Sequence, residues 1–252
     1  MATGSRDENP SIEVDFEPDL DGGLALNDWS DSWRVRVGTD QETSAVFEPA
    51  LAGPTGVLFI CAHGAGGHMN DKGMVAVSAQ LRGRGLQVVR FNFVYRDKGS
   101  SAPDPMPRLK QCYVDVVEHV RRTVKPDILI LGGRSMGGRV ASMLAADSYP
   151  CDGLLLLAYP LHPTGQPHKL RDAHLERIGV PVLCFNGTRD ALCRRDLMEQ
   201  AIAPLSDRWT MHWVEGADHS FHVLRSSRRT DGDVMAEVGE AAGAWVARSI
   251  QR

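Results

Sequence analysis

The chain has 252 residues, of which 42% are hydrophobic and 24% charged, a composition typical of one globular α/β-sized domain with a substantial core. The formal net charge of −4 argues against nucleic acid or an anionic membrane as the main partner. The longest apolar run, around Leu154 to Leu157, is too short to span a bilayer.

The N-terminal stretch of the chain is acidic and has little apolar periodicity. Arg6 alone opposes its carboxylates, which include Asp7, Glu8, Glu13, Asp15, Glu17, Asp19 and Asp21. We therefore expect residues 1–30 to form a flexible acidic segment and residues 31–252 to form the folded domain. This stretch shows neither a basic nor an apolar region of the kind found in secretory signals.

The five cysteines are dispersed and show no C-x-x-C spacing; they are Cys61, Cys112, Cys151, Cys184 and Cys193. An odd, scattered set in a chain of this length indicates reduced thiols. We expect these residues to be small buried apolar side chains, and the protein to be cytoplasmic.

Short β-rich runs alternate with helical stretches from residue 33 onward. Strands are predicted over 33–37, 43–47, 57–61, 87–93, 128–131, 154–158, 180–185 and 209–214, and helices over 73–84, 109–123, 138–146, 194–201 and 233–250. The first two strands alternate and suggest an antiparallel pair, whereas most later runs lack alternation, as expected for strands covered on both faces. The pattern predicts an α/β fold with a mostly parallel central sheet of about eight strands flanked by helices.

Two connections bear on how open a site could be. Only about twenty residues separate the strand ending near Tyr159 from the one starting near Val180, so we expect no large cap domain. The stretch VYRDKGSSAPDPMP after Phe93 is rich in Gly, Ser and Pro and is predicted to form a mobile rim.

The motif Gly133-Arg134-Ser135-Met136-Gly137 follows the strand DILIL and precedes a helical stretch. It fits G-x-S-x-G, in which a serine in a strained, sharp turn needs very small residues two positions to either side. The motif alone is weak, and a glycine-rich phosphate-binding or helix-capping turn is the alternative. Its position between strand and helix favours Ser135 as a nucleophile.

A serine hydroxyl becomes a good nucleophile when a base accepts its proton. After the strand VPVLCF the loop NGTRDALC offers Asp190 as the acid, and after the strand WTMHWV the loop EGADHSFH offers His219 as the base. Weaker alternatives are Asp218 or Asp196 for the acid and His222 for the base.

An oxyanion intermediate needs two preorganised N–H donors. We expect one from the backbone of Met136 and the other from Ala65 in the loop HGAGG, with Gly64 or Gly66 as alternatives. His63 and His68 flank this loop, and a metal role for them is disfavoured because no carboxylate or cysteine cluster accompanies them. No metal or cofactor is predicted.

Four residues follow strand ends on the edge of the sheet where α/β folds bind ligands. They are possible contacts for a substrate at the rim of the site, with ordinary packing as the alternative: Tyr95, Arg96, Tyr159 and His162.

From about Val57 onward the chain resembles the α/β-hydrolase superfamily. Within it, one branch shares a set of motifs beyond the predicted triad: HGAGG, RFNF, APDP, GGRSMGGR, YPLHPTG, KLRDAHL, GTRD and GADHSF. These motifs resemble the testis-expressed protein 30-like group, which is related to the dienelactone hydrolases. The resemblance implies a hydrolase without settling its substrate, and since dienelactone hydrolases carry a cysteine nucleophile, Ser135 argues against lactone-specific chemistry.

The sequence thus predicts a serine hydrolase that cleaves a small-molecule ester or thioester through an acyl-enzyme, with no nucleic-acid or membrane partner. The alternatives are a serine peptidase with the same triad, a non-catalytic interaction protein of the same fold, and a lyase or perhydrolase. Acyl specificity and oligomeric state are left open.

Overall fold

The computed structural model describes residues 30–51 and 53–250. The acidic segment predicted over residues 1–30 lies, up to position 29, outside the described residues. Within the described part of the chain, no helix is long and apolar enough to cross a membrane.

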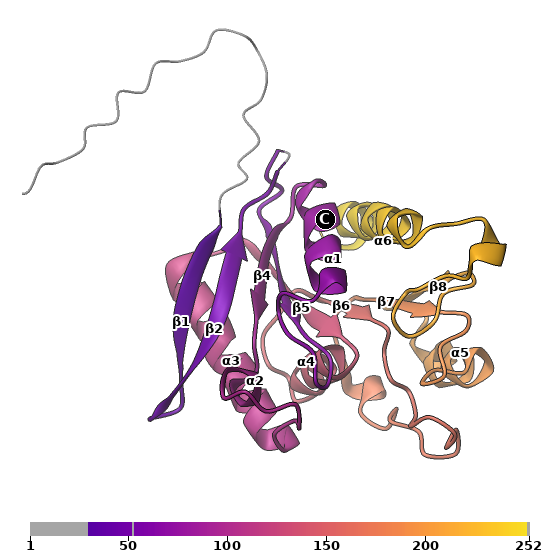
Figure 1. The fold of residues 1–252 in the computed structure, drawn as a ribbon, viewed down its shortest axis with the longest axis horizontal. Coiled ribbons are helices and arrows are strands. Elements are labelled where there is room, and N and C mark those ends of the chain that lie inside the picture. The colour runs from indigo at the N-terminus through magenta and orange to yellow at the C-terminus, as the bar shows by residue number, and fades with distance from the viewer. Residues whose placement is uncertain (1–29, 52, 251–252) are drawn as a thin grey trace, which may run out of the picture.

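An eight-stranded sheet runs through the molecule in the order β1-β2-β4-β3-β5-β6-β7-β8 (Figure 1). The strands are β1 (Asp31–Val37), β2 (Gln41–Glu48), β3 (Val57–Ala62), β4 (Gln87–Phe91), β5 (Ile128–Arg134), β6 (Gly153–Leu157), β7 (Val182–Gly187) and β8 (Trp209–Val214). β2 pairs antiparallel with both β1 and β4, and the other neighbours pair parallel. The predicted fold class is confirmed.

The burial of each strand follows its sequence pattern. Every residue of β3 (VLFICA) and β6 (GLLLL) is buried, because helices cover both faces of the central parallel strands. In β1 the first residues are exposed and burial alternates only toward Val37, since this strand is at the edge of the sheet.

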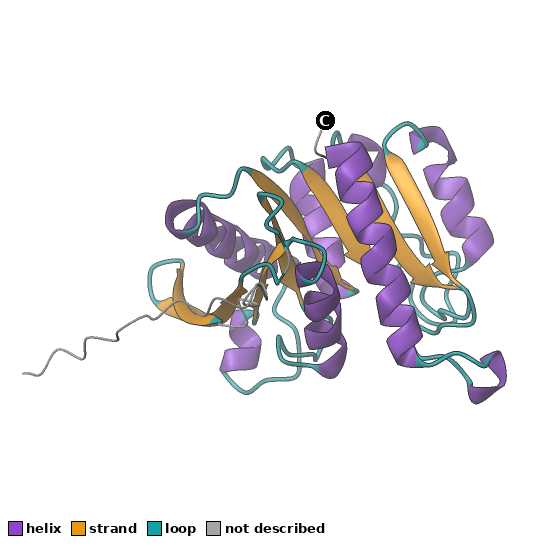
Figure 2. Cartoon of the chain, turned by 90° about the horizontal axis from the view of Figure 1, so that it is seen from above, coloured by secondary structure: helices purple, strands orange, loops and turns teal. Residues whose placement is uncertain are grey.

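Helices cover the sheet on both sides (Figure 2). They are α1 (Lys72–Arg82), α2 (Val94–Asp97), α3 (Met106–Thr123), α4 (Met136–Ala146), α5 (Arg195–Ile202) and α6 (Asp231–Trp245). One apolar cluster joins the buried side chains of α1 and α6 to one face of the sheet. The other cluster joins α3, α4 and α5 to the opposite face.

The helix boundaries differ from the sequence prediction where local chemistry decides them. α3 begins three residues early, at Met106, because Pro107 is tolerated in the first turn of a helix. α6 begins at a capping box in which Thr230 and Asp233 exchange hydrogen bonds, and its predicted end at 250 is a π-helical turn, Val246–Ile250. The four-residue helix α2 was not predicted.

The connection between β6 and β7 contains one turn of 3₁₀ helix, Leu175–Arg177, and no larger element. The prediction that no large cap domain covers the site is therefore confirmed. Because β5, β6, β7 and β8 pair parallel in sequence, the carboxyl ends of β5, β7 and β8 share one edge of the sheet.

One buried hydroxyl links a helix to the two strands that lead to the predicted site. Tyr113 of α3 is fully buried, and its Oη accepts a hydrogen bond from the Gly132 amide at 2.8 Å. The same oxygen lies 2.9 Å from the Ile60 carbonyl and 2.8 Å from the Gly132 carbonyl, so its proton has an acceptor on either strand. Burial raises the pKa of Tyr113 well above its usual value. The hydroxyl therefore serves as a neutral bridge between α3, β3 and β5.

We expect Tyr113→Phe to lower the free energy of unfolding by about 1–3 kcal/mol, because the buried Gly132 amide loses its acceptor. Urea denaturation measures the change. Tyr149→Phe is the matched control, since the Tyr149 hydroxyl donates to Glu118 in a partly exposed position and should cost less than about 1 kcal/mol. Equal losses in the two variants would contradict this assignment.

Candidate active site

The turn that carries Ser135 connects β5 directly to α4. Ser135 has φ 50° and ψ −113°, a backbone conformation that residues other than glycine rarely adopt. A Cβ at Gly133 would lie 2.2 Å from the Ala62 carbonyl oxygen, and one at Gly137 would lie 2.3 Å from the same atom. Glycine is thus required at both positions because β3 passes so close, and the spacing of G-x-S-x-G follows from that contact.

The structure brings the three predicted triad residues together. His219 Nε2 lies 2.9 Å from Ser135 Oγ, and His219 Nδ1 lies 2.8 Å from Asp190 Oδ2. The Asp190 side chain is fully buried, whereas a quarter of the His219 side chain is exposed. A His219 ring protonated on Nδ1 donates to Asp190 and presents Nε2 to the Ser135 hydroxyl. The arrangement is able to take a proton from the serine.

Asp190 is held by two donors besides the imidazole. The Leu192 amide donates to Oδ1 at 2.8 Å, and Asn186 Nδ2 donates to Oδ2 at 3.1 Å. Asn186 is itself fully buried and exchanges hydrogen bonds with the Tyr159 backbone. Asn186 was not predicted, and its only signal in the sequence is an asparagine directly after an apolar strand.

The alternative triad residues lie elsewhere. Asp218 accepts hydrogen bonds from the Ser220 and His222 amides and so shapes the turn around His219. Asp196 is on the exposed surface and pairs with Arg194. His222 is exposed and pairs with Asp231 at 3.0 Å.

A second serine–histidine contact lies beneath the site. Ser142 Oγ of α4 is 2.8 Å from His174 Nε2 and also donates to the Arg139 carbonyl oxygen at 2.8 Å. Ser142 is fully buried, so no substrate reaches it. Burial lowers the pKa of His174 to about 4. The pair fastens the β6–β7 connection to α4 and has the character of a structural contact.

The loop HGAGG approaches Ser135 closely, since a Cβ on Gly64 would lie 3.5 Å from the Ser135 Cβ. The Gly66 amide donates to Tyr95 Oη at 3.2 Å, and the Gly67 amide donates to the Gly64 carbonyl at 3.0 Å. These bonds remove Gly66 from the candidate oxyanion donors and leave the amides of Ala65 and Gly64.

The second predicted donor, the Met136 amide, is at the first position of α4, where helix amides have no acceptor within the helix. A cavity of about 420 Å³ opens over Ser135. Its walls include Ala65, Met74, Leu192 and His219. An acyl group bound there would have backbone N–H donors and the nucleophile on the same side.

The two histidines beside this loop have their ring nitrogens engaged in hydrogen bonds. His63 is fully buried, with Nδ1 2.7 Å from the Gly64 carbonyl oxygen and Nε2 accepting from the Phe93 amide at 3.1 Å. His68 bonds the Asn70 amide and the Asn92 side chain. Among the described residues, no group of three or more His, Cys, Asp or Glu side chains could hold a metal ion.

The four residues predicted as possible substrate contacts support loops instead. Tyr95 is buried and holds the Gly66 amide, while Arg96 donates to the Ser100 carbonyl at 2.9 Å. Tyr159 is fully buried and donates to the Arg171 carbonyl at 2.8 Å. His162 is buried and accepts from the Arg194 amide at 3.0 Å. None of the four lines the cavity at Ser135, so the alternative of packing residues fits them better.

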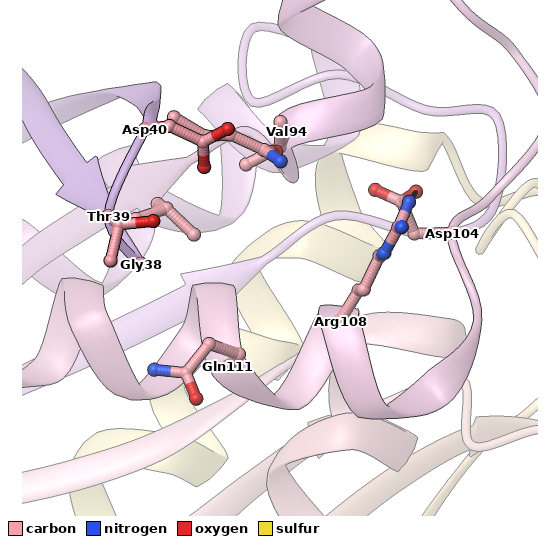
Figure 3. Close-up of a pocket in the computed structure, with 9 residues that line it drawn as sticks. Gly38, Thr39, Asp40, Val94, Asp104, Arg108 and Gln111 are labelled. Atoms are coloured by element: carbon pink, nitrogen blue, oxygen red, sulfur yellow. Dashed lines mark ion pairs between the residues drawn. The ribbon is translucent and has the colours of Figure 1, made fainter.

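A smaller hollow of about 180 Å³ lies between the β1–β2 turn and the start of α3 (Figure 3). It is lined by residues such as Thr39, Val94 and Gln111, and its Arg108 forms an ion pair with Asp104 at 3.7 Å. No predicted site residue lines it. We therefore place the candidate active site at Ser135 alone.

The sequence model of one protein family, the alpha/beta hydrolase domain, matches residues 55–247 of the chain. The chain therefore belongs to this family. It is similar in fold to an alpha-beta serine hydrolase homologue from Coxiella burnetii, with 20% identity, a TM-score of 0.67 and coverage of 85% of this chain and 96% of that one. An α/β serine hydrolase without lid from Xanthomonas campestris has 23% identity, a TM-score of 0.66 and coverage of 86% and 94%. A dienelactone hydrolase from Anabaena variabilis has 16% identity, a TM-score of 0.68 and coverage of 89% and 99%.

Burial lowers the pKa of His63 to about 4, from 6.5 for a free imidazole. Between these pH values the unfolded chain binds more protons at this residue than the folded one, so we expect stability to fall as pH drops from 6.5 toward 4. Each such histidine contributes at most about 1.4 kcal/mol per pH unit. NMR titration of the rings should find His63 neutral at pH 5. His222, whose pKa Asp231 raises, is the internal control and should already be charged there; a His63 midpoint near 6.5 would refute the assignment.

Burial keeps the cysteine thiols protonated at neutral pH. It raises the pKa of Cys61 and Cys112 to about 12 and that of Cys151 to about 11, and it also raises the pKa of Cys184 and Cys193. Since the thiolate is the reactive form, iodoacetamide at pH 8 should leave any hydrolase activity unchanged and modify the native protein slowly. Mass spectrometry after denaturation should then find all five thiols reactive. Rapid inactivation by the reagent would indicate a cysteine in the site.

Proposed function

We propose that the protein is a serine hydrolase that cleaves a carboxylic ester or thioester. Ser135 attacks the acyl carbonyl while His219 accepts its proton, and Asp190 orients the imidazole and stabilises its cationic form. The leaving alcohol or thiol takes the proton from His219. Water, deprotonated by the same imidazole, then cleaves the acyl-enzyme and releases the acid.

The observation that carries this proposal is the continuous chain of contacts from Asp190 through His219 to Ser135, at 2.8 and 2.9 Å. The amides of Ala65 and Met136 are the proposed oxyanion donors, each on a backbone that other contacts hold in place. A small-molecule acyl substrate is proposed because the cavity of about 420 Å³ suits a compact ligand.

The same geometry would serve a serine peptidase, and one similar fold is that of a puromycin-hydrolyzing peptidase from Mycobacterium tuberculosis. A non-catalytic interaction protein is the alternative from another class. The intact contacts of the triad favour an enzyme, because a fold that has lost catalysis has no need to keep a nucleophile in a strained turn.

We infer further that the chain lies in the testis-expressed protein 30-like branch and functions in the cytoplasm. The motifs outside the predicted triad support the branch. The five free cysteines, four of them buried, support a reducing compartment.

Ser135→Ala should lower the turnover of short 4-nitrophenyl esters and thioesters by on the order of 10⁴-fold or more. It should also abolish labelling by a fluorophosphonate probe, as should His219→Ala. Ser142→Ala is the matched control, since it removes the other serine that contacts a histidine and should leave labelling intact. Labelling that survives in Ser135→Ala, or loss of labelling only in Ser142→Ala, would refute the assignment of the nucleophile.

A further inference from the structure

Two cavities meet beside Ser135. The cavity of about 420 Å³ over the serine is adjoined by one of about 650 Å³, and both are lined by Asp71 and Arg134. The larger cavity lies between α1, the loop after His219 and the start of α6, with Ala76, Phe221 and Met235 among its apolar walls. Arg134 therefore faces both the space over Ser135 and the larger cavity.

Arg134 lies directly before Ser135 in the chain and lines both cavities. Its Nη2 donates to the His219 carbonyl oxygen at 3.2 Å, and its Nε is buried without a hydrogen-bond partner. No acidic oxygen of the described residues lies within 4.0 Å of its guanidinium, whereas Arg90 pairs with Glu48. Such a group is costly to desolvate unless something else supplies the missing acceptor.

The acidic residues that line the larger cavity are already engaged. Asp71 Oδ2 accepts from the His68 amide at 2.8 Å. Asp231 accepts from the Val223 amide at 3.0 Å and pairs with His222. The cavity is also lined by Lys72. Of the two side chains shared by both cavities, Asp71 is thus bound to its own loop, and Arg134 is the one with donors that meet no carboxylate of the described residues.

We propose that Arg134 binds a carboxylate of the substrate, so that the enzyme prefers esters or thioesters that carry an anionic group a short distance from the scissile carbonyl. A guanidinium presents a planar set of donors that matches a carboxylate, and an anion bound beside Arg134 would pair with its charge. The apolar walls of the larger cavity would then accommodate the rest of that part of the substrate. This assignment rests on the proposed hydrolase function.

The test compares matched substrates that differ only in charge. Mono-4-nitrophenyl glutarate against 4-nitrophenyl valerate places the carboxylate on the acyl side, and 4-acetoxybenzoate against its methyl ester places it on the leaving-group side. The relevant quantity is the kcat/KM of the charged ester divided by that of its neutral partner. In the pair for which the unmodified protein gives the higher ratio, Arg134→Gln should lower this ratio about 10- to 100-fold. Arg134→Lys should restore part of it. Arg225→Gln is the control, because Arg225 is exposed, lines neither cavity and carries the same charge.

A binding measurement keeps this test separate from that of the hydrolase function. Glutarate should bind the Ser135→Ala protein in calorimetry, and adding Arg134→Gln should weaken that binding at least about tenfold. Ratios and glutarate affinity that do not change with Arg134→Gln would overturn the role of Arg134. Failure of the unmodified protein to cleave any of the four esters would instead overturn the hydrolase function, while the glutarate affinities would still decide what Arg134 binds.

Discussion

The close approach of β3 to the turn after β5 is the constraint on which the candidate site depends. The Ala62 carbonyl oxygen occupies the space that a Cβ of Gly133 or Gly137 would need. This contact allows the chain to turn sharply enough for Ser135 to adopt φ 50° and project its hydroxyl from the sheet edge. It also fixes the Met136 amide at the start of α4 and brings the loop after β3 within reach of the serine. The buried Tyr113 hydroxyl links the same two strands through the Ile60 carbonyl and the Gly132 amide.

Much of this arrangement could be predicted from the sequence because it depends on local spacing and on the direction of the strands. The glycines at positions 133 and 137 indicate a sharp turn at Ser135 in which no Cβ fits two residues to either side. The parallel order of β5, β7 and β8 requires the loops after them to share one edge, so Asp190 and His219 could be assigned without coordinates. The strand and helix positions followed from apolar periodicity, which burial on one or both faces of the sheet imposes.

What escaped prediction depends on how loops pack against one another. Tyr159 and His162 follow a strand end, as substrate contacts do, yet Tyr159 donates to Arg171 of the same β6–β7 connection and His162 accepts from Arg194 at the start of α5. Asn186 supports Asp190 through a side-chain contact across four residues, which depends on how the loop after β7 turns back on the end of that strand. Ala65 and Gly66 are adjacent small residues, and the sequence does not say which of their amides faces an oxyanion. In the structure the Gly66 amide donates to the Tyr95 hydroxyl, which leaves the Ala65 amide as the candidate. The larger cavity beside Arg134 is formed by α1 and α6, which are distant in the chain.

The short β6–β7 connection has a consequence for how such a protein diversifies. With no cap domain, the walls of the two cavities belong to the domain itself: the loop after β3 and α1 at Ser135, and α1, the residues after His219 and the first turn of α6 in the larger cavity. Substitutions in those walls would reshape the space offered to a ligand without disturbing the turn that carries the nucleophile or any closing motion. Apart from Arg134, the residues that shape this space thus lie mostly outside the nucleophile turn, and single substitutions there can alter which ligand fits while Ser135 keeps its geometry.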